Sequence, residues 1–318
     1  MSATETGKRI VADIGGTNTR LALFDQERGE LSQRSSYLNA DYGCLEDIVD
    51  EWLQQLAGAP PAAACFAIAA PPFDDNIRMT NLDWRFSRSE LSTKFAFQPL
   101  LCINDFAANA YALTHLAPDD LLSLQTGESS GSTLAVIGPG TGLGGAILQA
   151  DGGAVRPCEP GHIGLSAGTD LELEILKVLL AQGGKLHAET LLSGPGIVRL
   201  YQTLAAIRGE EAGDLSPIEI SAMAQGGEDE LSVQAVTTFC ALLGSTCGDF
   251  VLASGAYGGL FLAGDILSGM GGFLESSPFL GRFSQKGDMR PHLSQVPVHL
   301  ITNTAPGLLG AGYAPLSP

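Results

Sequence analysis

Two glycine turns in the sequence carry the residue types that hold a phosphate. They occur in ADIGGTN and IGPGTGLGG, and their candidate ligand-binding residues are Asp13, Gly15, Gly16, Thr17, Asn18, Gly140, Thr141 and Gly142. Because glycine has no Cβ, the backbone N–H groups of such turns can approach a ligand closely. Two turns of this kind could hold a polyphosphate from both sides. The carboxylate of Asp13 is a candidate ligand for a magnesium ion that accompanies the phosphates.

An apolar strand pattern flanks each turn on both sides, as in RIVAD before the first turn and TRLALFD after it. This pattern predicts two β-hairpins, which read as a degenerate internal repeat and suggest a duplicated fold. Dinucleotide-binding and P-loop motifs require a helix after the glycines, so an NAD-dependent dehydrogenase is disfavoured. Ordinary hairpin glycines remain the alternative interpretation, although two such turns, one with an acid beside it, favour phosphate.

The rest of the chain predicts an α/β protein. Residues 44–57 have helical spacing of apolar positions, AAACFAIAA and PLLCIND read as buried strands, and FAANAYALTHL reads as a helix. Ser193 is a plausible N-cap for a helix in SGPGIVRLYQTLAAIRG, and a long apolar helix covers ELSVQAVTTFCALLGSTCGDFVLASGA. GGLFLAGDIL and VPVHLIT read as strands, and APGLLGAGYA as a short helix. A length of 318 residues suits about two domains.

Composition excludes several classes of partner. The formal net charge of −18 disfavours binding to nucleic acid or an anionic membrane. The six cysteines form no CxxC pair, which is typical of free thiols in a reducing compartment. The opening MSATETGKRI lacks the apolar core of a signal peptide, and the longest apolar run is too short to span a bilayer. We therefore expect a cytoplasmic protein.

Three further segments carry residues that could do chemistry. Asn104 and Asp105 follow a buried strand, where ligand sites of α/β sheets gather, and Asp105 could accept a proton from an attacking hydroxyl. On this pair alone a helix cap is the stronger interpretation. In CEPGHIG, Glu159 and His162 suit hydrogen bonds to a polyol better than a zinc site, because no second half of a zinc motif appears. Glu189 precedes a helix and could simply favour its positive end.

Taken together, these motifs resemble the bacterial glucokinases, in the hexokinase branch of the actin-like ATPase superfamily. The matching segments occur in family order over almost the whole chain and are ADIGGTNTRLALFD, TNLDW, INDFAANAYAL, IGPGTGLGGAIL, EPGHIG, AETLLSGPGIVRLY, GGLFLAGDI and GLLGAGYA. The resemblance implies a two-domain actin-like ATPase (ribonuclease H-like) fold with a cleft between the domains. The small α/β domain would hold residues 1–108 and 303–318, and the large one residues 109–302.

The resemblance also implies roles for individual residues. The family's sugar-binding positions match Asn104, Asp105, Glu159, His162 and Glu189, and Asp105 matches its catalytic base. The two glycine turns match its phosphate segments, and Gly258 and Gly259 lie where its nucleoside segment lies. The expected reaction transfers the γ-phosphoryl group of MgATP to the 6-hydroxyl of glucose, with Asp13 at the metal. Family members are often homodimers.

Two departures and several alternatives qualify this expectation. Related repressor-type sugar kinases carry CxCGxxGC after the histidine, whereas HIGLSAGTDLELE follows here, so we expect no structural zinc. Pro160 stands where glucokinases usually have glycine, and its rigid φ should fix the Glu159 loop. A kinase for fructose, mannose or an N-acylated hexosamine is the nearest alternative. A non-catalytic sugar-sensing regulator is a second, disfavoured by the charge. The sequence leaves ATP, ADP and polyphosphate open as donors.

Overall fold

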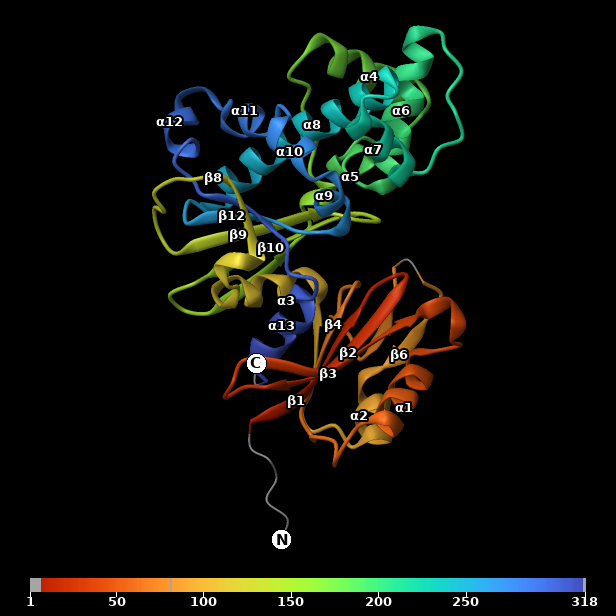
Figure 1. The fold of residues 1–318 in the computed structure, drawn as a ribbon, viewed down its shortest axis with the longest axis vertical. Coiled ribbons are helices and arrows are strands. Elements are labelled where there is room, and N and C mark those ends of the chain that lie inside the picture. The colour runs from red at the N-terminus through yellow and green to blue at the C-terminus, as the bar shows by residue number, and fades with distance from the viewer. Residues whose placement is uncertain (1–6, 81, 317–318) are drawn as a thin grey trace. The chain divides into compact units, whose positions relative to one another are not determined.

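The computed structural model describes residues 7–80 and 82–316, so Asn81 of the TNLDW motif lies outside the described residues. The chain divides into two compact units (Figure 1): unit 1 comprises Met1–Leu116 and Asn303–Pro318, and unit 2 comprises Ala117–Thr302. The predicted domain boundary at residue 108 falls inside a helix, α3 (Asp105–Ala112). Unit 1 keeps that helix whole, because α3 packs against α13 (Pro306–Tyr313) of the same unit.

Unit 1 is built on a five-stranded sheet with the strand order β3-β2-β1-β4-β7. The strands are β1 (Lys8–Ile14), β2 (Asn18–Asp25), β3 (Glu30–Leu38), β4 (Ala64–Ile68) and β7 (Leu100–Asn104). β1 and β2 form an antiparallel hairpin, and β1, β4 and β7 are parallel. The fully buried sequence ACFAI makes β4 the kind of apolar strand that a sheet covered on both faces requires.

Helices cover both faces of this sheet (Figure 1). On one face, α1 (Leu45–Gln55) and α2 (Arg88–Phe95) enclose a core with large buried side chains such as Trp52 and Phe66. On the other face, α3 and α13 pack on Val11, Ala22 and Phe24. A small hairpin of β5 (Asn76–Arg78) and β6 (Arg85–Ser87) and the 3-10 turns η1 (Asn39–Asp41) and η2 (Leu113–His115) complete the described elements of unit 1.

Unit 2 is built on a six-stranded sheet with the order β11-β10-β9-β12-β13-β8. The strands are β8 (Leu121–Gln125), β9 (Thr133–Pro139), β10 (Leu143–Gln149), β11 (Ala154–Cys158), β12 (Gly259–Leu262) and β13 (Val298–Ile301). β9 and β10 form an antiparallel hairpin, while β9, β12 and β13 are parallel. Strands 3-2-1-4-7 of unit 1 and 11-10-9-12-13 of unit 2 therefore repeat one topology, which confirms the duplication that the two hairpins suggested.

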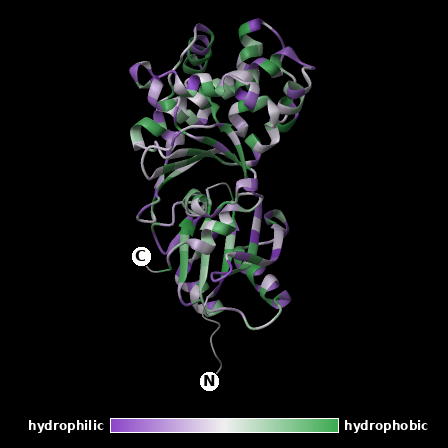
Figure 2. Cartoon of the chain, turned by 60° about the vertical axis from the view of Figure 1, so that its left-hand side comes forward, coloured by the Kyte–Doolittle hydropathy of each residue, from purple (hydrophilic) through white to green (hydrophobic). Residues whose placement is uncertain are grey.

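The helices of unit 2 gather around one long helix, α8 (Glu230–Ser254). The others are α4 (Asp170–Ala181), α5 (Ala188–Leu191), α6 (Gly194–Arg208), α7 (Pro217–Gly226), α9 (Asp265–Met270), α10 (Gly272–Ser276), α11 (Phe279–Ser284) and α12 (Arg290–Leu293), with the 3-10 turns η3 (Pro118–Asp120), η4 (Pro160–His162) and η5 (Gly287–Met289). The apolar window of α8 has the length to cross a membrane, but 83% of it is buried inside the protein. It is the core helix of this unit. Figure 2 shows that apolar residues are concentrated in the strands of the sheets.

The elements predicted from the sequence were found, whereas β3 and α7 were not predicted. β3 is largely exposed, with one buried residue, so it lacks the apolar alternation that identifies a strand. α7 has two buried residues, Ile220 and Ala224, so it too lacks the apolar pattern that identifies a helix. The Ser193 cap is confirmed, since its hydroxyl accepts a hydrogen bond from the Gly196 N–H at 3.1 Å.

Candidate functional site

The first glycine turn connects β1 to β2 at the carboxyl end of the parallel strands of unit 1. The Gly15 N–H donates to the Asn18 carbonyl at 2.9 Å, which closes the turn. Among the described residues, the N–H groups of Gly16 and Thr17 have no hydrogen-bond acceptor, and neither residue is buried. These N–H groups are therefore available to an anion.

Asp13 lies in β1 just before this turn, with its side chain 20% exposed. An Arg20 guanidinium nitrogen lies 3.5 Å from its carboxylate. A Cβ built on Gly307 would lie 3.0 Å from the Asp13 carboxyl carbon, so glycine at the start of α13 leaves room for this acid. The positive end of α13 favours the ionised carboxylate.

Asn104 and Asp105 lie at the same edge of the sheet as this turn. Ile14 pairs with Ile68, and Ile68 pairs with Asn104, so the ends of β1, β4 and β7 are in register. One intervening strand separates the turn from Asn104, which corresponds to about 10 Å. The predicted phosphate, metal and base residues of unit 1 are thus brought together along one strand edge.

The structure separates the two interpretations of the Asn104–Asp105 pair. The Oδ1 of Asn104 accepts hydrogen bonds from the N–H groups of Phe106 and Ala107, at 2.9 and 3.2 Å, so Asn104 is the cap of α3. Asp105 is the first helical residue, and its carboxylate accepts a bond from the Phe106 N–H at 2.9 Å. Because Asn104 already caps the helix, capping does not account for Asp105.

The second glycine turn connects β9 to β10 in unit 2. The Gly140 N–H donates to the Gly142 carbonyl, and the Gly140 carbonyl accepts from the Gly194 N–H, both at 2.8 Å. Within the part of the chain that is described, the N–H groups of Thr141 and Gly142 have no acceptor. Like the first turn, this one presents two consecutive N–H groups.

Glu189 lies directly against this second turn. Its Oε2 accepts a hydrogen bond from the Leu143 N–H at 2.8 Å. A Cβ on Gly142 would overlap this oxygen, and a Cβ on Gly161 would lie 2.6 Å from the Leu143 carbonyl oxygen and 3.1 Å from the carboxylate. Glycine is therefore required at both positions for the carboxylate to reach the turn.

Glu159 and His162 lie at the two ends of η4, which packs on the start of β10. Both are exposed, whereas Pro160 and Gly161 between them are buried. The His162 ring meets the His187 ring edge to face, with centroids 5.1 Å apart, and the Nδ1 of His187 lies 3.0 Å from the Gly161 carbonyl oxygen. Unit 2 thus places η4, which carries Glu159 and His162 at its ends, against the start of β10 and against α5, which carries Glu189.

Gly258 and Gly259, the predicted cofactor-binding pair, lie away from the second turn. Both are buried, and Gly259 pairs with Leu134 at the start of β9, at the opposite end of the strand from the turn. A Cβ on Gly258 would lie 2.7 Å from the Thr133 carbonyl oxygen, so this glycine allows close strand packing. The glycine at the turn's end of β12 is Gly264, which is exposed, has a φ of +107° and lies against Pro139.

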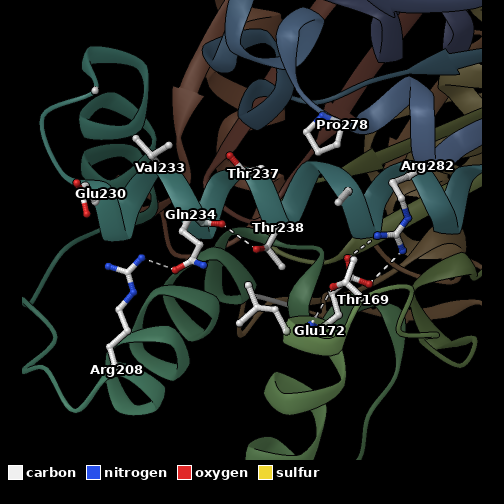
Figure 3. A pocket seen from close by; sticks show the side chains of 13 residues that line it. Thr169, Glu172, Arg208, Glu230, Val233, Gln234, Thr237, Thr238, Pro278 and Arg282 are labelled. Atoms are coloured by element: carbon white, nitrogen blue, oxygen red, sulfur yellow. Dashed lines mark hydrogen bonds and ion pairs between the residues drawn. The ribbon is translucent and has the colours of Figure 1, made fainter.

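Two cavities in unit 2 differ in their relation to these residues. One of about 470 Å³ is lined by Thr141, Glu189 and Ser193 together with the basic residues Lys185 and Arg199. Another of about 590 Å³ contains none of the predicted residues (Figure 3). In its wall, Arg282 forms an ion pair with Oε1 of Glu172. The Oε2 of Glu172 accepts hydrogen bonds from Arg282 and from the Gly168 N–H. The larger cavity therefore has a structural ion pair in its wall, and the smaller one adjoins the candidate site.

The donor set fits magnesium better than zinc. Among the described residues no group of three or more His, Cys, Asp or Glu side chains could hold a metal. Magnesium usually binds one or two carboxylates and completes its shell with water and substrate phosphates, which Asp13 beside a phosphate-binding turn can satisfy. Burial, and then the charge of Glu159, raise the pKa of the Cys158 thiol, which disfavours the thiolate that zinc requires.

Asn39 is a residue of this region that sequence reasoning missed. It lies in η1 and is 1% exposed, and it makes three hydrogen bonds to the first turn and the strand that follows. The only signal in the sequence is a lone asparagine after a polar segment, more than twenty positions from the turn. No local pattern connects the two.

The chain is similar to known proteins over almost its whole length. The family model described as glucokinase matches residues 10–316. A glucokinase of Saccharophagus degradans is 40% identical over 309 residues, which cover 95% of this chain and 96% of that protein. A glucokinase of Caulobacter sp. is 38% identical over 313 residues, covering 97% and 95%. The crystal structure of a glucokinase from an Antarctic psychrotroph superposes with a TM-score of 0.86 at 41% identity, covering 97% of this chain and 98% of that one.

Proposed function

This chain belongs to the glucokinase family, and from that premise we propose how its residues transfer a phosphoryl group to a sugar. Family membership makes it an ATP-dependent hexose kinase that phosphorylates glucose, with the two-domain actin-like ATPase fold. The finer proposal is that the 6-hydroxyl of glucose attacks the γ-phosphoryl group and that Asp105 takes the hydroxyl proton. The product is glucose 6-phosphate.

The position of Asp105 carries this proposal. Asp105 directly follows the carboxyl end of β7, one intervening strand away from a turn whose N–H groups have no acceptor among the described residues, and Asn104 rather than Asp105 caps the helix. The positive end of α3 favours the ionised form that accepts a proton. Phosphoryl transfer passes through a loose transition state, so positioning and charge stabilisation contribute more than covalent chemistry. A general base in this position contributes about 10²–10⁴-fold to the rate.

The sugar would be held by hydrogen bonds from Asn104, Glu159, His162 and Glu189. The Oδ1 of Asn104 is occupied by the cap, so its amide N–H groups would donate to a sugar hydroxyl. Carboxylates accept from hydroxyls, and an imidazole can do either. A site built to pair hydroxyls rejects analogues that lack them, because its own polar groups then lose their partners.

The phosphates would contact the free N–H groups of the two turns, at Gly16 and Thr17 and at Thr141 and Gly142. Gly264, rather than Gly258 or Gly259, would allow the nucleoside to approach at the end of β12. Asp13 would hold a magnesium ion, directly or through water. When bound, that ion supplies charge neutralisation for the phosphates, which an acidic protein with no lysine in either turn otherwise lacks.

A coupled assay of sugar 6-phosphate formation tests the proposal. Glucose, fructose, mannose and N-acetylglucosamine would each be offered with ATP, ADP and polyphosphate, with and without magnesium. We expect the highest kcat/KM with glucose and MgATP. A higher kcat/KM with another hexose would favour the alternative of a kinase for that sugar.

We also propose that the enzyme is a cytoplasmic homodimer. The homodimer rests on what the family resemblance implies, and the compartment on the six free cysteines, which are typical of a reducing environment. Light scattering after size-exclusion chromatography should give about twice the chain mass of 33.0 kDa. A mass equal to one chain at assay concentration would contradict the dimer.

A further inference from the structure

The side chain of Asn39 reaches the first glycine turn from a separate segment. Its Nδ2 donates to the Gly15 carbonyl at 2.9 Å, and its Oδ1 accepts from the Thr19 hydroxyl at 2.8 Å. Its backbone N–H donates to the Thr17 carbonyl, also at 2.9 Å. Alternate residues 15, 17 and 19 of the turn and strand are therefore all tied to this one residue.

The chemistry of these partners fixes which way the Asn39 amide faces. A backbone carbonyl can only accept, so the NH₂ group must face Gly15 and the oxygen must face Thr19. Asn39 is 1% exposed and Thr19 is 0% exposed, so water has little access to the amide or to the Thr19 hydroxyl. A residue with only a donor or only an acceptor would leave one buried group unsatisfied.

The bond to Gly15 determines where the next N–H points. The carbonyl of Gly15 and the N–H of Gly16 belong to one planar trans peptide, so they point in opposite directions. With the carbonyl directed at Asn39, the Gly16 N–H is directed away from it, and no described residue accepts from it. If this peptide flipped, it would present a carbonyl oxygen to the phosphate and repel it.

We propose that Asn39 is a positioning residue for nucleotide binding: it holds the Gly15–Gly16 peptide in the orientation that presents an N–H group to the triphosphate. The proposal rests on the proposed function, in which this turn binds phosphate. Asn39 does not contact the nucleotide itself. Its effect is therefore on the affinity for ATP, and the sugar-binding side chains do not depend on it.

The test compares two substitutions with a matched control. Asn39→Asp keeps the size and the acceptor but replaces the donor by a carboxylate, and Asn39→Ala removes both without adding charge. Tyr42→Phe, just beyond η1, removes the hydroxyl that bonds to Glu51 at 2.9 Å and does not touch the turn. The KM for ATP, the Kd for glucose without nucleotide, and the Tm would be measured for each.

We expect Asn39→Ala to raise the KM for ATP roughly tenfold, the effect of losing about one hydrogen bond. Asn39→Asp should raise it further, and the Kd for glucose should stay within about twofold in both. Tyr42→Phe should lower the Tm without moving the KM for ATP. A KM for ATP that moves equally in Tyr42→Phe and Asn39→Ala, or in neither, would overturn the proposal. Wild-type enzyme that forms no sugar phosphate would instead contradict the proposed function.

Discussion

The two glycine turns present the same groups but are held by different kinds of side chain. The first turn is held by Asn39, a neutral, buried amide with no predicted role in binding sugar. The second is held by Glu189, a charged and partly exposed carboxylate that is itself a proposed sugar ligand. The difference implies that a sugar bound to Glu189 would also affect the conformation of the second turn. The conformation of the first turn is held by Asn39, which has no proposed contact with the sugar.

Among the substitutions that test this comparison, Gly142→Ala is expected to have the largest effect on activity. A Cβ in Gly142→Ala would overlap the Glu189 carboxylate and displace it from both the Leu143 N–H and the sugar. Displacement of a binding group by about 1 Å can cost about 10²-fold in rate, so kcat/KM should fall by that order for both substrates. Steady-state kinetics with each substrate varied would measure it.

Two alanine variants provide the comparison for Gly142→Ala. Gly152→Ala, in the turn that connects β10 to β11, meets no atom within 4 Å and should behave as wild type. Gly15→Ala in the first turn meets only the Asn18 carbonyl oxygen at 3.3 Å, so its effect should be smaller than that of Gly142→Ala. Equal losses at Gly15 and Gly142 would remove the distinction between the turns.

Substitutions of Glu189 should separate its hydrogen bond to the Leu143 N–H from its proposed contact with the sugar. Glu189→Gln can still accept from the Leu143 N–H but loses the charge toward the sugar, so the Kd for glucose should rise about tenfold while the KM for ATP changes little. Glu189→Ala loses both bonds, and both constants should rise. Calorimetry of glucose binding and a coupled assay would provide the values. An unchanged KM for ATP in Glu189→Ala would show that the second turn does not need this carboxylate.

The smallest expected effect is that of a substitution in β13. This strand occupies in the sheet of unit 2 the position that β7 occupies in the sheet of unit 1. β7 leads to Asp105, whereas β13 carries His299, whose buried Nδ1 has no partner among the described residues. Relieving that atom in His299→Leu should raise the free energy of unfolding by about 1 kcal/mol and leave the kinetics unchanged.

The same variant should change the pH dependence of stability. Burial lowers the pKa of His299, so the unfolded chain binds this proton more tightly than the folded one. Stability from this residue is present above the ordinary histidine pKa of about 6.5 and is lost as the pH falls below it. Urea unfolding at pH 7 and pH 5 should show that the free energy of unfolding falls less between the two pH values in His299→Leu than in wild type. An equal loss in both proteins would exclude His299 as its source.

The sequence predicted the parts of the site that depend on local patterns. The glycine turns, the apolar strands beside them and the strand-end position of Asp105 all follow from neighbouring residues. The same holds for the duplication, because the hairpin pattern occurs twice.

The features that the sequence did not predict depend on contacts between distant segments. Asn39 is tied to Gly15 across an intervening hairpin strand, and no periodicity reports that. In GGLFLAGDI, only the register with β9 shows that Gly264, and not Gly258 or Gly259, lies at the turn's end of β12. The hydrogen bond from the Leu143 N–H to Glu189 joins residues 46 positions apart, and only the fold brings them together.

The most direct test of the whole account is the turnover of Asp105→Asn with glucose and MgATP, measured beside its glucose affinity. Asparagine keeps the size of the side chain and can still bond to the Phe106 N–H, but it cannot take the hydroxyl proton. We predict that kcat falls about 10²–10⁴-fold while the Kd for glucose changes by less than about tenfold. A variant that retains near-normal turnover would contradict Asp105 as the base and, with it, the mechanism proposed here.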